Sequence, residues 1–138
     1  IAKPLAGDAI ACDLTDDGQV EALMQTVRAR HGRLDVVVIV AGAHGSQTVD
    51  QLTRDTLLRC FELNVIGPAS AIKHAARVME RGAIIYVSSA AAEMNTVGVA
   101  VYGSTKAAGE RLDRWLAAEA AFGSLLAVAF LRATRTRA

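Results

Sequence analysis

The chain has 138 residues, of which 52% are hydrophobic, and a formal net charge of +1, so we expect a single globular domain over 1–138. This balance excludes the strongly basic surface of a nucleic-acid-binding protein and the low hydrophobicity of a disordered chain. No apolar run approaches the roughly 20 residues that a membrane span needs, and the first residues do not resemble a signal peptide. Cys12 and Cys60 form neither a C-x-x-C pair nor a metal-ligand cluster. We therefore expect a cytoplasmic protein without a metal site, a nucleic-acid partner or a membrane partner.

Strand-like and helix-like segments alternate along the first half of the chain. Residues 8–12 form a short, mostly apolar run that predicts a buried strand. Residues 15–18 offer N-cap chemistry for an amphipathic helix that closes at Gly32. Residues 34–40 are an unbroken β-branched run, which is typical of a strand covered on both faces. A loop of small residues, 41–45, follows this strand.

The second half of the chain continues the alternation. Residues 51–81 predict mostly helix, with a long helix from about residue 57 after a short lead-in, and residues 82–87 predict a buried strand. A helix from 102 to 122 and a strand over 124–130 follow. This order predicts an α/β fold with a Rossmann-like, doubly wound parallel sheet in three layers (α/β/α).

Three candidate functional residues follow the strand predicted over 82–87. Ser89 comes where that strand ends, and Tyr102 and Lys106, four residues apart, share one face of the next helix. Ligands bind at the carboxyl ends of strands in such sheets. A phenol has an ordinary pKa of about 10, and a neighbouring ammonium favours the phenolate, so this pair suits proton transfer near neutral pH. A serine hydroxyl can orient a substrate oxygen.

The spacing of these residues resembles a known family. Ser89 precedes Tyr102 by thirteen positions, and residues 102–106 read Tyr-Gly-Ser-Thr-Lys. This is similar to the Tyr-x-x-x-Lys motif and upstream serine of the short-chain dehydrogenases/reductases. The resemblance implies NAD(P)-dependent hydride transfer between a carbonyl and an alcohol. It implies that Tyr102 is the general acid/base, that Lys106 lowers its pKa and holds the cofactor ribose, and that Ser89 binds the substrate oxygen.

Further cofactor-binding residues follow from the same resemblance. The segment 12–16 resembles the strand end whose aspartate accepts a hydrogen bond from the adenine amino group, which places that role on Asp13. A plain loop cap is an equal alternative for this residue. Ala41 and Gly42 match the end of the family's Asn-Asn-Ala-Gly motif, whereas Ile39 and Val40 replace its two asparagines.

The helix around Asn64 resembles the family segment that carries the fourth catalytic residue. In the family, the backbone carbonyl of this asparagine holds a water that passes protons to the lysine. The residues here give a separate physical reason. Pro68 has no N–H and crowds the carbonyl of Asn64 four residues earlier, so that carbonyl lacks a helical donor. A plain proline kink is the alternative. Met94 lies where the family contacts substrate, and His44 is expected to be a solvated loop residue.

Two family motifs are absent from this sequence. Nothing resembles the N-terminal Thr-Gly-x-x-x-Gly-x-Gly turn that binds the cofactor pyrophosphate. Leu131, Arg132 and Ala133 stand where the family usually has Pro-Gly. The chain thus resembles the middle of a short-chain dehydrogenase, with an incomplete sheet that lacks the strand between 8–12 and 34–40. We expect the chain as written to bind cofactor weakly or not at all.

Several alternatives stay open on the sequence alone. The cofactor is NAD or NADP, with NADP as the first choice, and the substrate is an unspecified small carbonyl or alcohol. A catalytically silent binding or scaffold protein, or an epimerase or dehydratase of the extended branch, is the alternative function. Apolar residues on more than one helix face predict a homodimer or homotetramer; they include Val65, Ile72, Val78, Leu112, Trp115 and Leu116.

Overall fold

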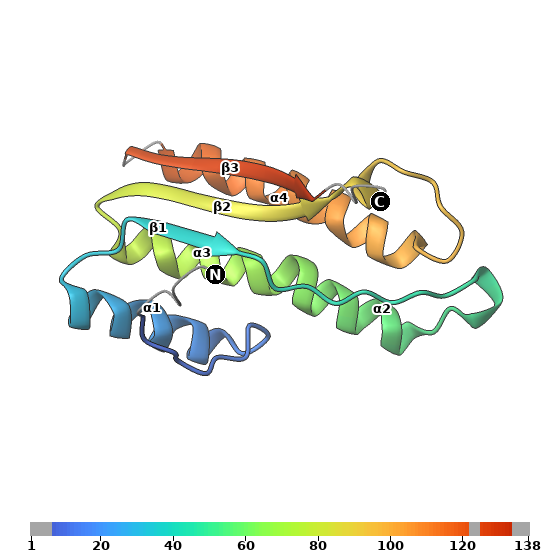
Figure 1. Ribbon diagram of the computed structural model, residues 1–138, viewed down its shortest axis with the longest axis horizontal. Helices are drawn as coiled ribbons and strands as arrows, with labels where there is room; N and C mark the ends of the chain where they lie inside the picture. Colours follow the sequence, from blue (N-terminus) through green and yellow to red (C-terminus); the bar gives the residue numbers. More distant parts are fainter. Residues whose placement is uncertain (1–6, 122–124, 134–138) are drawn as a thin grey trace, which may run out of the picture.

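Three parallel strands form the sheet of the computed structural model, which describes residues 7–121 and 125–133. Their order in the sheet is β1 (Val36–Ile39), β2 (Arg81–Ser89) and β3 (Leu125–Ala133), with Val36 opposite Ala83 and Arg81 opposite Leu125 (Figure 1). The three strands predicted over 34–40, 82–87 and 124–130 are therefore present, but the first is shorter than predicted and the other two continue beyond residues 87 and 130. Residue 124 lies outside the described residues.

The helices also follow the predicted order. They are α1 (Asp17–His31), α2 (Arg54–Phe61), α3 (Gly67–Val78) and α4 (Ala100–Ala121), and short 3-10 turns cover Val49–Gln51 and Ala90–Ala92. A π-helical turn, Glu62–Ile66, joins α2 to α3 without a break. The long helix expected from about residue 57 therefore begins earlier, at Arg54, where Thr53 accepts a hydrogen bond from the Thr56 N–H.

Helix α1 shows the end signals that the sequence predicts. The Asp16 carboxylate accepts a hydrogen bond from the Gln19 N–H, so it satisfies one of the free donors of the first turn. Gly32 ends the helix in the left-handed region, at φ 71°, and its N–H donates to the Arg28 carbonyl. Glycine is the residue that adopts this conformation without steric cost.

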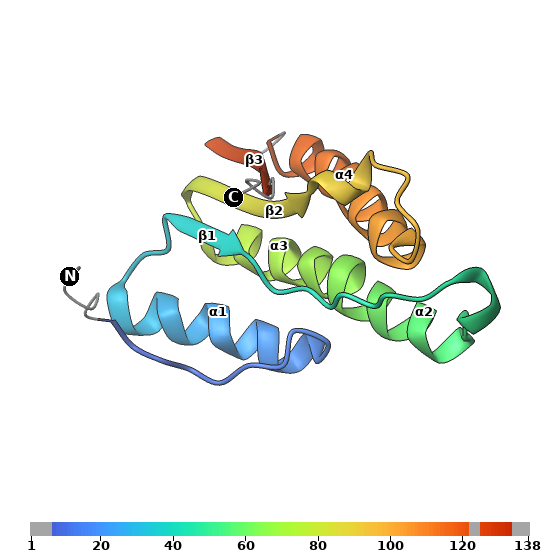
Figure 2. The ribbon, with the colours of Figure 1, turned by 45° about the vertical axis from the view of Figure 1, so that its right-hand side comes forward.

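Helices α3 and α4 lie on one face of the sheet, α1 packs beside α3, and α2 continues from α3 beyond the ends of the strands (Figures 1 and 2). Side chains that alternate along the strands share a face, and Ile39, Ile84 and Tyr86 point to the helical side and are buried. They form the core with residues of α1, α3 and the α3–β2 connection, namely Val20, Met24, Ala71, Ile72, Ala75 and Met79. On the opposite face, Val36 and Val38 are 54% and 53% exposed. The described residues thus supply the parallel sheet of the predicted α/β fold and one of its helical layers.

The prediction of a strand over residues 8–12 is wrong. These residues precede α1 in irregular conformation and are mostly exposed. A strand needs a hydrogen-bonded neighbour, and within the described part of the chain none lies beside this segment. This agrees with the expected gap between residues 8–12 and 34–40.

The apolar residues expected on more than one helix face differ in their burial. Val65 and Ile72 are buried, whereas Leu112 and Trp115 are exposed. Within the described residues, no helix is long and apolar enough to cross a membrane, and no group of His, Cys, Asp and Glu side chains has a metal-binding arrangement.

Candidate active site

The π-helical turn between α2 and α3 sets the position of Asn64. The Gly67 N–H donates to the Glu62 carbonyl, five residues back, instead of four. Pro68 has no N–H, so the Asn64 carbonyl lacks the donor that a regular helix would supply four residues later. The structure gives it a partner that the sequence analysis did not foresee. The Tyr86 hydroxyl of β2 donates to it at 3.1 Å.

The Asn64 side chain is fully buried and joins two other segments. Its Oδ1 accepts from the Ala43 N–H at 2.7 Å, and its Nδ2 donates to the Ala43 carbonyl at 2.9 Å. Nδ2 also donates to the Thr105 hydroxyl at 2.8 Å, and that hydroxyl donates to the Tyr102 carbonyl at 2.8 Å. Asn64 therefore fixes the loop after β1 against the first turns of α4.

Lys106 extends from α4 to the same place. Its side chain is buried, with the residue 3% exposed, and its Nζ donates to the Val87 carbonyl of β2 at 3.0 Å. Nζ lies 4.8 Å from the Tyr86 ring centroid and 5.9 Å from the Tyr102 ring centroid. Burial lowers the pKa of the Lys106 ammonium, and the negative charge of Asp113 partly opposes this shift. The charged form thus depends on its aromatic, carbonyl and carboxylate surroundings.

Gly42 lies beside this ammonium at the end of β1. A Cβ at position 42 would lie 3.2 Å from the Asn64 Oδ1 and 3.3 Å from the Lys106 Nζ. Both contacts are tighter than side chains normally accept, so a residue without a side chain suits this position. The sequence analysis did not predict this proximity of Gly42 to Lys106.

Tyr102 lies one turn before Lys106 on α4 and is half-buried. Its ring packs against the His44 imidazole, with 4.8 Å between the centroids and a 53° tilt. The sequence analysis expected His44 to be a solvated loop residue. It is exposed as expected, but it also covers one side of the Tyr102 ring.

The two serines at the end of β2 have different surroundings. The Ser89 hydroxyl accepts from the Ala91 N–H at 3.2 Å and caps the short turn that follows. Ser88 is buried, and within residues 7–121 and 125–133 its hydroxyl has no hydrogen-bond partner. The turn after Ser89 packs closely on α4, since a Cβ at Gly103 would meet the Ala91 carbonyl oxygen at 2.5 Å. This contact brings the serine segment next to the turn of α4 that carries Tyr102.

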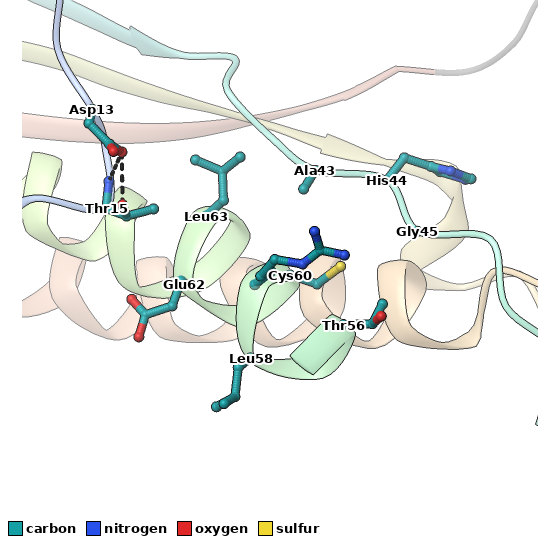
Figure 3. Close-up of a pocket in the computed structure, with 11 residues that line it drawn as sticks. Asp13, Thr15, Ala43, His44, Gly45, Thr56, Leu58, Cys60, Glu62 and Leu63 are labelled. Atoms are coloured by element: carbon teal, nitrogen blue, oxygen red, sulfur yellow. Dashed lines mark hydrogen bonds between the residues drawn. The ribbon is translucent and has the colours of Figure 1, made fainter. Parts of the chain in front are cut away.

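A cavity of about 800 Å³ adjoins the loop after β1. Asp13, Ala43 and Leu63 face it from three different segments (Figure 3). The Asp13 carboxylate accepts from the Thr15 N–H and hydroxyl at 2.9 and 2.8 Å, and these bonds lower its pKa. Asp13 therefore has the loop-capping role that the sequence left open and also lines a cavity.

Met94 lines a second cavity of about 520 Å³ between the segment after Ser89 and α4. The side chain is well exposed, at 59% for the residue. This position is compatible with the predicted wall of a substrate pocket.

Asp113 is the most unusual charged residue of the described structure. It is fully buried, and within the described ranges neither carboxylate oxygen has a hydrogen-bond partner. Burial raises the pKa of this carboxyl to about 7, against a smaller opposing effect of Lys106. The sequence analysis did not single it out.

Comparison with known proteins identifies the family. A family model described as short chain dehydrogenase matches residues 5–129. The chain is 37% identical over 115 residues to (+)-borneol dehydrogenase 1 from Salvia officinalis, covering 80% of this chain and 44% of that protein. It is 33% identical over 120 residues to 7alpha-hydroxysteroid dehydrogenase from Escherichia coli, covering 83% and 47%.

Solved structures agree with this match. A short-chain dehydrogenase from Streptomyces avermitilis has a TM-score of 0.82 at 32% identity, covering 94% of this chain and 49% of that one. One from Mycobacterium smegmatis has a TM-score of 0.89 at 25% identity, covering 94% and 55%. The chain therefore belongs to the short-chain dehydrogenase/reductase family and has its Rossmann fold. It spans less than half the length of the curated relatives named above.

The hydrogen bonds of the Asn64 side chain give a first prediction. Asn64→Ala leaves both backbone groups of Ala43 and the Thr105 hydroxyl without this partner. We expect the free energy of unfolding to fall by about 3 kcal/mol, measured by urea denaturation. Ser104→Ala, at an exposed residue of α4 next to Thr105, is the control. An equally small loss of stability in both variants would contradict the role of Asn64.

The burial of Asp113 gives a second prediction. Its pKa rises from 3.8 to about 7 on folding, so the folded state binds this proton more tightly. The tighter proton binding stabilises the folded state. This contribution to the free energy of unfolding is complete below pH 4 and is lost as the pH rises to 7. The stability of Asp113→Asn relative to wild type should therefore increase over this range, by up to about 4 kcal/mol.

Urea denaturation at a series of pH values measures this difference. Asp55→Asn, at an exposed carboxylate of α2, is the control and should show no comparable increase. A difference for Asp113→Asn that does not change between pH 4 and 7 would mean that its carboxyl titrates as it does in solvent.

Proposed function

We propose that this chain forms the catalytic part of an NAD(P)-dependent oxidoreductase that interconverts a carbonyl and an alcohol. The observation that carries the proposal is the buried Lys106 ammonium, which is held by the Val87 carbonyl and lies between the rings of Tyr86 and Tyr102. A buried cation next to a half-buried phenol is an arrangement that favours the phenolate during proton transfer.

Each residue of the proposed Ser-Tyr-Lys-Asn site has a defined task. The Tyr102 hydroxyl would donate a proton to the carbonyl oxygen in reduction and remove it from the alcohol in oxidation. Lys106 would stabilise the phenolate by its charge, and Ser89 would donate a hydrogen bond to the same substrate oxygen. The Asn64 carbonyl would hold a water that returns protons to Lys106.

The residues at this edge of the sheet fit a nicotinamide cofactor. Asp13 offers a carboxylate acceptor for an adenine amino group at the wall of the larger cavity. Ala41 and Gly42 allow a close approach of the ligand to the backbone, while Lys106 and Tyr102 would hold the ribose hydroxyls. Bound NAD(P) would supply or accept the hydride.

For the cofactor we propose NADP as the first choice and NAD as the second. Among the similar solved structures, a metagenomic short-chain oxidoreductase with NADP has a TM-score of 0.83 at 26% identity, covering 95% of this chain and 61% of that one. The proposed substrate is a small molecule that would contact Ser89 and Met94.

Tyr102→Phe tests the proposed chemistry because it removes one hydroxyl. In the full-length natural protein, we expect kcat for a panel of carbonyl and alcohol substrates to fall at least about a hundredfold. Cofactor affinity, measured by fluorescence titration, should fall much less than kcat, because Lys106 would still hold the ribose. Near-normal turnover in the variant would refute the role of Tyr102, and cofactor binding without turnover in the wild type would favour a silent binding protein.

We also propose that the protein is a homodimer or homotetramer that uses α4. Leu112 and Trp115, three residues apart on this helix, are both exposed, and Arg111 lies over the Trp115 ring at 5.4 Å. Exposed aromatic and aliphatic side chains on one helix face are typical of subunit interfaces.

Light scattering at micromolar concentration tests the assembly. We expect a dimer or tetramer for the wild type and a shift towards monomer for Trp115→Glu, because the new charge would lose solvation in an interface. Glu119→Gln on an exposed part of α4 is the matched control and should keep the assembly. A monomeric wild type would contradict the proposal.

A further inference from the structure

Tyr86 is a buried tyrosine that the proposed Ser-Tyr-Lys-Asn site does not use. It lies in the middle of β2, is 0% exposed, and points to the helical face of the sheet. Its hydroxyl donates to the Asn64 carbonyl at 3.1 Å. Pro68, four residues after Asn64, has no N–H that could donate to this carbonyl. A tyrosine hydroxyl in the core needs a partner, and here the partner is the Asn64 carbonyl.

The ring of the same tyrosine faces Lys106. The Nζ lies 4.8 Å from the Tyr86 ring centroid, compared with 5.9 Å for Tyr102. An ammonium within about 6 Å of an aromatic face is attracted by the ring quadrupole, and more strongly where water is excluded. Because Lys106 is itself 3% exposed, little water competes with the ring.

Gly109 of α4 makes room for this arrangement. A Cβ at position 109 would lie 2.7 Å from the Tyr86 hydroxyl oxygen and 3.0 Å from the Asn64 carbonyl oxygen. Glycine in the interior of a helix costs stability relative to alanine. The space at Gly109 lets the hydroxyl, the carbonyl and α4 approach one another, which is a physical use for this residue.

We propose that Tyr86 is a positioning residue of the active site, whose hydroxyl orients the Asn64 carbonyl and whose ring supports the charged Lys106. The catalytic consequence rests on the proposed hydride-transfer function. A carbonyl oxygen has two lone pairs. The Tyr86 hydroxyl occupies one direction and leaves the other for the proposed relay water. Tyr86 thus links the two residues that would return the proton to Tyr102.

Tyr86→Phe removes the hydroxyl and keeps the ring. In the full-length natural protein we expect kcat to fall about tenfold, with little change in the KM of substrate or cofactor, because the hydroxyl contacts neither. Ile84→Val is the matched control, since it perturbs a buried residue two positions earlier on the same face of β2 and changes no polar group. It should keep kcat even if it lowers stability.

Gly109→Ala disturbs the same hydrogen bond from the side of α4 without removing a functional group. We expect it to reproduce the kcat loss of Tyr86→Phe. The two changes together should cost little more than either alone, because both break one contact. A wild-type kcat in Tyr86→Phe would overturn the role of the hydroxyl.

Tyr86→Met removes the ring and fills its space with a flexible apolar side chain. The readout is the titration of the Lys106 side chain by ¹³C-lysine NMR, with the signal identified by its loss in Lys106→Arg. We expect the titration to move down by about one pH unit in Tyr86→Met and to stay unchanged in Tyr86→Phe. An unchanged titration in Tyr86→Met would overturn the role of the ring.

This titration does not depend on turnover, so the two proposals can fail separately. A wild-type protein with no reductase activity, but with the expected shift in Tyr86→Met, would refute hydride transfer and support the positioning of Lys106. An active wild type whose kcat is insensitive to both Tyr86→Phe and Gly109→Ala would support hydride transfer and refute the positioning role.

Discussion

The hydrogen bonds of Asn64 are the constraint on which the rest of the site depends. The side chain holds both backbone groups of Ala43 and the Thr105 hydroxyl, and the carbonyl accepts from Tyr86. One residue of the π-helical turn thus joins the loop after β1, helix α4 and strand β2. Because Lys106 and Tyr102 lie on the part of α4 that Thr105 anchors, their position follows from the same network.

Pro68 contributes to this network because it has no backbone N–H. In a regular helix the Asn64 carbonyl would accept a hydrogen bond from the N–H four residues later. The Tyr86 hydroxyl would then compete with that N–H or need another buried acceptor. Pro68 supplies no such N–H, and the Asn64 carbonyl in the π-helical turn accepts from the Tyr86 hydroxyl. The irregular helical turn at Asn64 thereby forms a hydrogen bond with Tyr86 of β2, 22 residues away in the chain.

The parts of the fold and site that follow from local patterns could be predicted from the sequence. The spacing of Tyr102 and Lys106, and the effect of Pro68 on Asn64, are properties of a few neighbouring residues. Tyr86 and Thr105 could not be predicted, because their roles arise from contacts 22 and 41 residues apart in the chain. The strand predicted over 8–12 failed for the same reason, since an apolar run forms a strand only where a partner strand lies beside it.

The electrostatics of α4 show how closely the proposed chemistry is tied to the packing. Burial works against the charge on both Lys106 and Asp113, which lie two turns apart on one face of this helix. Lys106 retains a carbonyl acceptor and two aromatic neighbours, whereas within the described residues Asp113 has no hydrogen-bond partner. When Asp113 takes up a proton near neutral pH, the free-energy cost of burying its negative charge disappears. Lys106 then loses the favourable interaction with that negative charge. The rings of Tyr86 and Tyr102 then contribute a larger share of the stabilisation of the Lys106 ammonium. Because a neutral ring does not change its charge between pH 4 and 7, it stabilises the ammonium over a wider pH range than a carboxylate alone.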